Sequence, residues 1–542
     1  MREQENWKPA WKDIQKYIAP TRGHFDDSEP NKGKEIDHKT IVNGHASRAL
    51  NKLASGMTSG LTSPSRPWFR LGLPDTDLAK FAPVKEWLAT VQDRMMAVFA
   101  KSNIYGAFNG IYYETGGFGT GAMALLPDYQ DVIRARLYTS GEYALGTGPD
   151  CRVNAFTRKQ WMTVGQIVEE FGIDNVSETV KGMFNNKQVD QWRQVIQLIQ
   201  PNANKSGSPM INSKAYRSVH WEVGSPSDSF LRVGGFRRFP ILAPRWNTTT
   251  TADVYGTSPG WEILGDVKML QKMEKDALIA LDKVADPPVQ ADGNVADQVN
   301  LLPGGLTRSS ATSPNAGVRP VYQLSPDFAA IENKIQNTKN AISEGLFADL
   351  FMMISQADRP NMTAREVVER HEEKLLMLGP VLERLESELL DPTIDISFDI
   401  MLEAGLLPPF PEDLAGQEIN IEYISMLAQA QKMIGTTAVE QLTAYVGNLA
   451  AAKPTILDKF DEDEAVDSYA GMLGTPPKII RTAEVVAQIR EERAKANAAA
   501  QAAAAGPALV EGAKTMSETK IGQNSALDAL LAGAAGTPAV GN

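Results

Sequence analysis

The segment of this sequence closest to a phosphate-binding loop is glycine-rich, Gly116-Gly117-Phe118-Gly119-Thr120-Gly121. A Walker A loop needs Lys and then Ser or Thr after its last glycine, because the ammonium group neutralises the terminal phosphates. Here Ala122-Met123 follows, and the dinucleotide pattern G-x-G-x-x-G is not met either. We therefore expect a tight turn or close backbone packing at this segment, in preference to nucleotide binding.

Metal-ligating patterns are equally weak. The chain has five histidines, which are His24, His38, His45, His220 and His371. None of them forms H-E-x-x-H, the pattern that places two imidazoles and a glutamate on one helix face. We expect solvated helix positions rather than a catalytic metal site.

The acidic run Asp461-Glu462-Asp463-Glu464 lacks the glycine and the distal glutamate of a calcium loop. Carboxylates are stabilised at the positive end of a helix dipole, so the run favours a helix N-terminus. It also holds the best candidate residues for an alternative, a metal-dependent DNA-processing enzyme. There is no G-x-S-x-G elbow and no motif around Cys151, so we expect no catalytic residue, metal or cofactor.

Composition sets broad limits. A length of 542 residues suggests three or four domain-sized units, and 43% hydrophobic with 22% charged residues is ordinary for a globular protein. The single cysteine excludes an intrachain disulfide and fits a reducing compartment. No apolar run reaches the ~20 residues of a membrane span, and the polar N-terminus lacks a signal-peptide pattern. The net charge of -12 argues against a protein that is basic everywhere, although it is compatible with a channel through which DNA slides.

The first 260 residues show mixed periodicity, and we expect an α+β body. Helices are predicted around Trp7 to Ile14, over Ile41–Met57, over Val84–Ala100 and over Thr163–Phe171 with Thr163 as its cap. Strands are predicted over Val132–Leu145, Val153–Phe156, Val189–Leu198 and Arg217–Trp221.

After residue 260 the pattern changes to long helices. The first, Ile263–Val284, is stopped by Pro287-Pro288, and a second, Phe328–Ile354, follows an insertion of loops and short strands. After a polar break at Ser355–Met362, a third helix begins at a capping box of Thr363 and Glu366. This third helix is expected to kink at Gly379-Pro380, because proline removes a backbone donor. Further helical segments are expected over Ile421–Ile434, Thr437–Ala450, Glu464–Met472 and Glu484–Ala505.

Five segments in order carry a family resemblance. They are Leu61 to Leu71, Asn103 to Gly121, Gly141-Glu142-Tyr143 with Thr163 to Gly172, Tyr255 to Gly260, and Asp463 to Gly474 with Pro476-Pro477, Ile479-Ile480-Arg481 and Ile489 to Arg493. Together they resemble the head-to-tail connecting (portal) proteins of podovirus-type phages, over about Trp7 to Arg493. The alternative within the same particle is another capsid or tail component.

The resemblance implies a mainly helical α+β fold that assembles as a ring, typically twelve-fold, at one capsid vertex. The units it implies are a wing at 1–260, a first stem helix at 261–286, a clip at 287–326, a second stem helix at 327–354, a tunnel loop at 355–362, a kinked wing helix and following segment at 363–415, and a helical crown at 416–505. The segment 506–542 is rich in Ala and Gly and has few large side chains, so its composition predicts a mobile tail.

The resemblance also implies that the loop between the two later helices projects into a DNA channel. It carries Gln356, Asp358, Arg359 and Asn361. A ring of single positive charges from Arg359 can centre a duplex through its phosphates without reading its sequence. The alternative is a plain helix connection in which Arg359 pairs with Asp358.

The partners implied are other copies of the chain, double-stranded DNA, the terminase packaging motor, a major capsid or scaffolding protein, and tail adaptor or tail tube proteins. No membrane and no cofactor is expected. The protein would be made in the host cytoplasm and reside in the virion.

Overall fold

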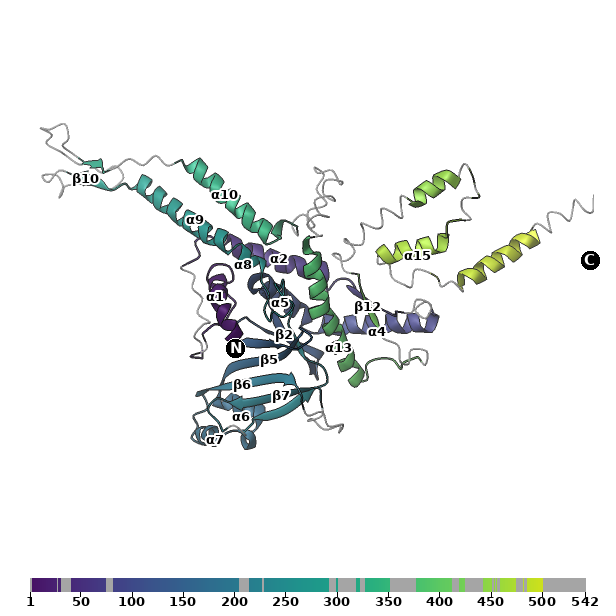
Figure 1. The fold of residues 1–542 in the computed structure, drawn as a ribbon, viewed down its shortest axis with the longest axis horizontal. Coiled ribbons are helices and arrows are strands. Elements are labelled where there is room, and N and C mark those ends of the chain that lie inside the picture. Colours follow the sequence, from purple (N-terminus) through teal and green to yellow (C-terminus); the bar gives the residue numbers. More distant parts are fainter. Residues whose placement is uncertain are drawn as a thin grey trace, which may run out of the picture.

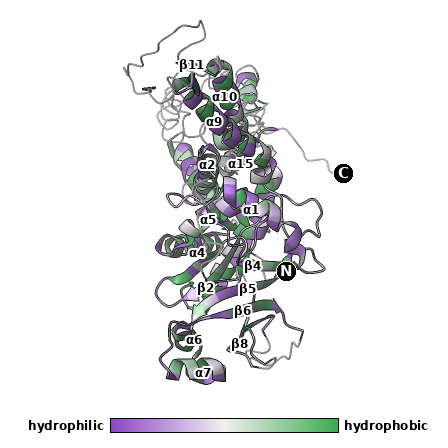
Figure 2. Cartoon of the chain, turned by 90° about the vertical axis from the view of Figure 1, so that its left-hand side faces the viewer, coloured by the Kyte–Doolittle hydropathy of each residue, from purple (hydrophilic) through white to green (hydrophobic). Residues whose placement is uncertain are grey.

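A computed structural model describes residues 2–26, 28–30, 40–74, 81–203, 214–226, 229–291, 299–300, 318–321, 327–350, 377–411, 419–424, 442–450, 453, 455, 459–473, 481 and 485–500. The molecule is elongated. A helical arm projects from one end of a central body and a sheet with two small helices forms the other end (Figure 2).

The centre of the body is helix α5 (Ile104–Phe118), of which twelve of the fifteen residues are buried. A helix apolar on all sides must be enclosed by other elements. Those around it include α1 (Lys8–Tyr17), α2 (His45–Leu61), α4 (Ala82–Lys101) and α8 (Pro259–Glu262). The helices expected at residues 7–14, 41–57 and 84–100 are thus confirmed. The one expected from Ile41 begins at His45, because the backbone N–H groups of Val42 and Asn43 bind the Gln271 side chain instead.

Two antiparallel sheets lie beside the helices (Figure 1). The smaller has the order β3-β2-β9, with β2 at Ala122–Asp128, β3 at Val132–Tyr138 and β9 at Ile241–Leu242. The larger has the order β4-β5-β6-β7-β8, with β4 at Tyr143–Thr147, β5 at Val153–Thr163, β6 at Trp192–Pro201, β7 at Tyr216–Glu222 and β8 at Arg232–Phe236.

The expected strands are confirmed with shifted ends. The expected single strand Val132–Leu145 is two strands, because Thr139, Ser140 and the left-handed Gly141 (φ 95°) turn the chain between them. Strands β2, β8 and β9 had no sequence prediction.

Two small helices close the far end of the larger sheet. Helix α6 (Val164–Phe171) begins at the expected cap, where the Thr163 hydroxyl accepts from the Gln166 N–H and the Gln166 side chain accepts from the Thr163 N–H. Helix α7 (Glu178–Asn185) begins at Ser177. Their buried side chains form a second hydrophobic core with the sheet, separate from the main core.

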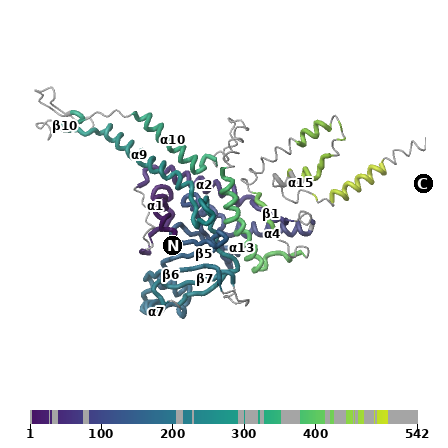
Figure 3. The backbone as a smooth tube through the Cα atoms, viewed as in Figure 1, coloured from purple at the N-terminus to yellow at the C-terminus, as the bar shows by residue number. Residues whose placement is uncertain are grey.

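The arm consists of α9 (Leu264–Ala285) and α10 (Phe328–Gly345), which lie side by side (Figures 1 and 3). Strands β10 (Val289–Ala291) and β11 (Val318–Pro320) pair antiparallel at its tip. Helix α9 agrees with its prediction. Helix α10 does not continue to Ile354 as expected; it ends at Gly345, and the left-handed Phe347 (φ 53°) redirects the chain.

A strand replaces an expected helix near residue 421. Residues Asn420–Tyr423 form β12, which pairs with β1 (Phe69–Gly72). The Ile424 N–H also donates to the Trp68 carbonyl. Tertiary pairing overrides local helical periodicity here, because β1 would otherwise leave backbone groups unpaired beside buried side chains.

The helix that begins at residue 377 departs from regular α-helical geometry after Pro380, not at the expected Gly379-Pro380 kink. Residues 377–385 are α-helical through Gly379-Pro380, and Glu386–Leu390 form one π-helical turn before α13 (Asp391–Glu403). The Asp391 N–H donates to the Glu386 carbonyl, five residues back. Pro392 has no N–H and cannot continue the regular ladder, so the wider turn accommodates it.

Towards the C-terminus, residues 442–450, α15 (Glu462–Leu473) and residues 485–500 are helical, which agrees with three of the expected segments. The capping box of Thr363 and Glu366 and the tail at 506–542 lie outside the described residues.

The glycine-rich segment is a site of close backbone packing, as the sequence indicates. Gly119 ends α5 in the left-handed region (φ 89°). A Cβ placed there would lie 2.1 Å from the Gly256 carbonyl oxygen, and neither backbone can yield easily. The Ser258 hydroxyl donates to the Gly117 carbonyl at 2.7 Å, which holds α8 across the end of α5.

We predict that Gly119→Ala lowers the free energy of unfolding by more than about 2 kcal/mol, since it adds a backbone clash to an unfavourable φ. Gly182→Ala in α7 is the matched control, because a Cβ added at this glycine would meet no other atom within 4 Å. This control should be neutral or stabilising by about 0.5–1 kcal/mol. Chemical unfolding of both variants measures the difference; equal stability of the two would refute the packing account.

Candidate assembly surface

One face of α9 carries a regular stripe of residues. Leu264, Val267, Gln271, Glu274, Leu278 and Leu281 follow one another at alternating intervals of three and four. This spacing places all six on one face of a helix. At the base of the arm the stripe is covered, because Leu264, Val267 and Gln271 are buried against the body.

Polar residues in the middle of the stripe clamp the arm to the body. The Gln271 Oε1 accepts from the N–H groups of Val42 and Asn43, both at 2.8 Å, and its Nε2 donates to the Asn43 carbonyl at 2.7 Å. Glu274 accepts from the Asn43 side chain and pairs with Lys339 of α10 at 3.1 Å. Both polar side chains of the covered part of the stripe, Gln271 and Glu274, therefore have partners.

His45 completes this clamp. Its Nε2 lies 3.0 Å from the Lys339 carbonyl and 2.8 Å from the Ser343 hydroxyl, so the start of α2 holds α10 while the residues just before it hold α9. Burial lowers the pKa of His45; the hydrogen bond with the Lys339 carbonyl opposes this effect, and the positive charges of Arg48 and Lys339 add to it. A neutral imidazole that binds two partners is thus favoured at this position.

Beyond the clamp the stripe is apolar again but uncovered. Leu278 and Leu281 are each 52% exposed, and Val284, three residues further, is 43% exposed. This part of α9 extends past the edge of the body, and among the described elements α10 lies beside it (Figures 1 and 2). Large apolar side chains gathered on one exposed face mark an interaction surface. We refer to Leu278, Leu281 and Val284 as the distal stripe.

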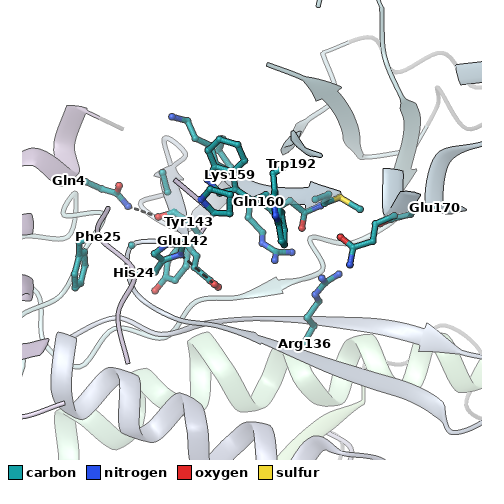
Figure 4. Close-up of a pocket in the computed structure, with 18 of the residues that line it drawn as sticks. Gln4, His24, Phe25, Arg136, Glu142, Tyr143, Lys159, Gln160, Glu170 and Trp192 are labelled. Atoms are coloured by element: carbon teal, nitrogen blue, oxygen red, sulfur yellow. Dashed lines mark hydrogen bonds and ion pairs between the residues drawn. The ribbon is translucent and has the colours of Figure 1, made fainter. Parts of the chain in front are cut away.

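A cavity of about 700 Å³ lies where the N-terminal segment meets the larger sheet (Figure 4). Gln4 fixes this junction, because its Nε2 donates to the Tyr143 carbonyl and lies 2.9 Å from the Tyr255 hydroxyl. That hydroxyl also accepts from the Leu145 N–H at 2.9 Å, and burial raises the pKa of Tyr255 to about 12. The tyrosine therefore stays neutral, and the junction is a structural hydrogen-bond network.

In the described parts of the chain, no three or more His, Cys, Asp or Glu side chains form a group that could hold a metal ion.

The acidic run begins α15, as the sequence favours: the Asp461 carboxylate accepts from the N–H groups of Asp463 and Glu464. Asp463 in turn forms a bidentate pair with Arg490 at 2.6 and 2.7 Å.

The expectation for the histidines is wrong at the three described positions. His24 lies in a loop with its side chain only 11% exposed, His45 is a half-buried part of the arm clamp, and His220 lies buried in strand β7. Cys151 occupies a turn with φ 59° and is a free thiol. No described helix is long and apolar enough to cross a membrane.

The proposed channel-loop residues Gln356, Asp358, Arg359 and Asn361 lie outside the described residues, as does the whole segment 351–376. The distal stripe was not singled out from the sequence. Its signal was available in the heptad-like spacing of α9. Periodicity alone, however, cannot tell which part of a stripe the body covers.

Comparison with known proteins places the whole chain in context. Residues 1–480 match the family model for the bacteriophage head to tail connecting protein. The portal protein of Salmonella phage epsilon15 is 46% identical over 99% of this chain and 96% of its own length. The probable portal protein of Bordetella phage BPP-1 is 42% identical over 93% of this chain and 90% of its own length.

Among solved structures, a chain from the virion of a native gene transfer agent particle matches with a TM-score of 0.39 and 11% identity, over 87% of this chain and 95% of that chain.

We predict that Gln271→Ala lowers the free energy of unfolding by about 1–3 kcal/mol, because it leaves the N–H groups of Val42 and Asn43 without their acceptor. Lys275→Ala, one turn further along α9 and exposed, is the control and should change stability by less than about 0.5 kcal/mol. Chemical unfolding combined with hydrogen exchange of the Val42 and Asn43 amides tests this. Unchanged protection of those amides in Gln271→Ala would contradict the clamp.

Proposed function

The chain belongs to the family of bacteriophage head to tail connecting proteins and functions as a portal connector, and we propose that its copies form a ring around a DNA channel at one capsid vertex. The observation that carries this proposal is the sequence identity of 46% and 42% to a portal protein and a probable portal protein, over 96% and 90% of their lengths. DNA would enter the head through the ring during packaging and leave through it during ejection.

The arrangement of elements supports an assignment of each part of the chain to one region of a portal subunit. The α+β body at 1–260 would be the wing, α9 and α10 the stem, and the insertion at 287–326, which begins and ends with β10 and β11, the clip. The segment at 416–505 would form the crown and residues 506–542 a mobile tail. The pairing of β12 with β1 favours a place beside the wing for residues 419–424, so the helical part of the crown would begin after them.

The distal stripe supports self-association. Leu278 and Leu281 continue a face of α9 that is buried at the base of the arm, and a second copy of the arm could cover what the body leaves exposed. In a ring, each subunit would supply the cover for its neighbour, so no exposed stripe would remain.

The remaining partners follow from the position of a portal in the particle. The terminase motor would dock during packaging, a major capsid or scaffolding protein would surround the ring, and tail adaptor or tail tube proteins would bind the clip. We propose that the role is structural, without catalysis or a cofactor. The protein would be made in the host cytoplasm before it enters the virion.

We predict that the double variant Leu278→Asn and Leu281→Asn loses the ring and sediments as small oligomers, because it removes the apolar area that neighbouring arms would bury. Ile279→Asn is the matched control: this residue is 41% exposed on the same helix but about 100° away from Leu278. Light scattering and sedimentation of both variants provide the measurement. If the double variant still assembled fully, the stripe would not be the subunit contact.

The channel loop gives a second prediction. We propose that Arg359, flanked by Gln356, Asp358 and Asn361, contacts DNA phosphates from each subunit. Arg359→Ala should leave ring mass unchanged and reduce the DNA packaged or retained per particle, because a ring of positive charges is lost.

Arg365→Ala, six residues further in the sequence, is the control for loss of a nearby charge. Failure of Arg359→Ala to assemble would identify a structural residue. Normal DNA content would remove the loop from the DNA path.

A further inference from the structure

A row of polar side chains crosses one face of the larger sheet. Residues Arg158, Gln197, His220 and Arg232 are direct cross-strand partners on β5, β6, β7 and β8. Because partners in register lie on the same face, all four project to one side. Two residues away along the strands on one side, Phe156 and Ile199 belong to the main core. On the other side, Val195, two residues from Gln197, and Met162, four residues from Arg158, belong to the second core.

This polar row opens on a cavity of about 270 Å³ between the two sheets. The opposite wall comes from the smaller sheet, which contributes Arg136 and Tyr138 of β3. Arg158 and Arg136 also line the larger cavity described above, where Arg136 and Glu170 lie at the same end (Figure 4). The polar cavity is therefore reachable from solvent.

The lining of the cavity has an excess of positive charge. Arg136, Arg158 and Arg232 face it, and Glu170 is its single acidic lining residue. Three positive charges and one negative charge leave two positive charges at neutral pH. Arg232 is already engaged, since its Nη2 donates to the Glu170 carbonyl at 2.6 Å and its guanidinium lies 3.7 Å from the Glu170 carboxylate.

Two buried polar atoms of the row have no hydrogen-bond partner among the described residues. They are the Arg158 Nε and the His220 Nδ1. The Arg158 guanidinium stacks over the Tyr138 ring at 4.8 Å, which holds its position but leaves the Nε–H without an acceptor. Buried donors left without an acceptor are costly and uncommon in folded proteins.

The charge excess acts on His220. Burial lowers its pKa to about 4, and the repulsion from Arg232, Arg158 and Arg136, in that order, adds to the effect. All three guanidinium groups therefore act on the same imidazole. An anion in the cavity would reverse this repulsion and give both unpartnered groups an acceptor.

We propose that the cavity between the two sheets binds a compact oxyanion of the phosphate class, held by Arg136, Arg158 and Arg232. A phosphate dianion matches the two excess charges, and guanidinium groups bind its oxygens in a bidentate manner. A volume of about 270 Å³ admits a phosphate or diphosphate group with ordered water. The bound anion would join the sheet ending in α6 and α7 to the rest of the wing.

The proposal is tested by isothermal titration of the intact protein with inorganic phosphate at pH 7.5 and constant ionic strength, with chloride as the reference anion. We expect saturable binding and a rise in the thermal unfolding midpoint. Arg136→Gln should weaken the affinity by at least about tenfold; since Arg136 is exposed, this variant should fold. Arg158→Gln should weaken it further, and its ring mass and circular dichroism report whether it folds.

Arg134→Gln is the matched control, because this arginine is two residues away on β3, is exposed and does not line the cavity. Phenyl phosphate distinguishes the source of the anion: if it displaces phosphate, the site accepts a phosphate group carried by a larger molecule, and if it does not, the site holds free phosphate. Absence of saturable binding to the wild-type protein would overturn the proposal. An equal loss in Arg134→Gln and Arg136→Gln would overturn it too, since the effect would then be one of surface charge.

Discussion

The apolar face of α9 is longer than the body that covers it, and much of the architecture follows from this mismatch. At its base the face is buried and its polar members are fully bonded by Val42, Asn43 and Lys339. At its distal end, Leu278 and Leu281 have no cover from their own subunit beyond what α10 provides. A helix gains most of its stability in a protein from packing such a face, so a neighbouring subunit placed on it would stabilise the arm.

The contacts at the end of α5 join the arm to the body. Helix α8 precedes α9 directly and is held on α5 through Ser258 and the close approach of Gly256 to Gly119. A buried ion pair adds α13 to the same unit: Arg245 donates to Glu388 through its backbone and guanidinium, and to the Asp253 carbonyl. Breaking such a pair leaves a buried charge, which makes this joint costly to open.

The sequence alone predicts much of this fold where the signal is local. The heptad-like spacing and Pro287-Pro288 define α9, and Thr163 with Gln166 defines the start of α6. Sequence-based prediction fails where a segment distant in the sequence determines the local secondary structure. β12 is a strand because β1 lies beside it, and the π-helical turn before Pro392 carries the glutamate that binds Arg245.

The candidate surfaces were hidden for the same reason. Arg158, Gln197, His220 and Arg232 lie at unrelated places in the sequence, and only strand register brings them into one row. The distal stripe has the same periodicity as the covered part of α9, so sequence periodicity cannot separate an internal face from an external one. The polar row depends on strand register and the distal stripe on where the body ends, and both are tertiary properties.

If a neighbouring subunit covers the distal stripe of α9 in a closed ring, electron cryomicroscopy of the purified protein will show it most directly. We expect a ring with an axial channel, in which Leu278 and Leu281 of each subunit are buried against the arm of the next. A closed ring in which these side chains face solvent, or a chain that remains monomeric at high concentration, would contradict it.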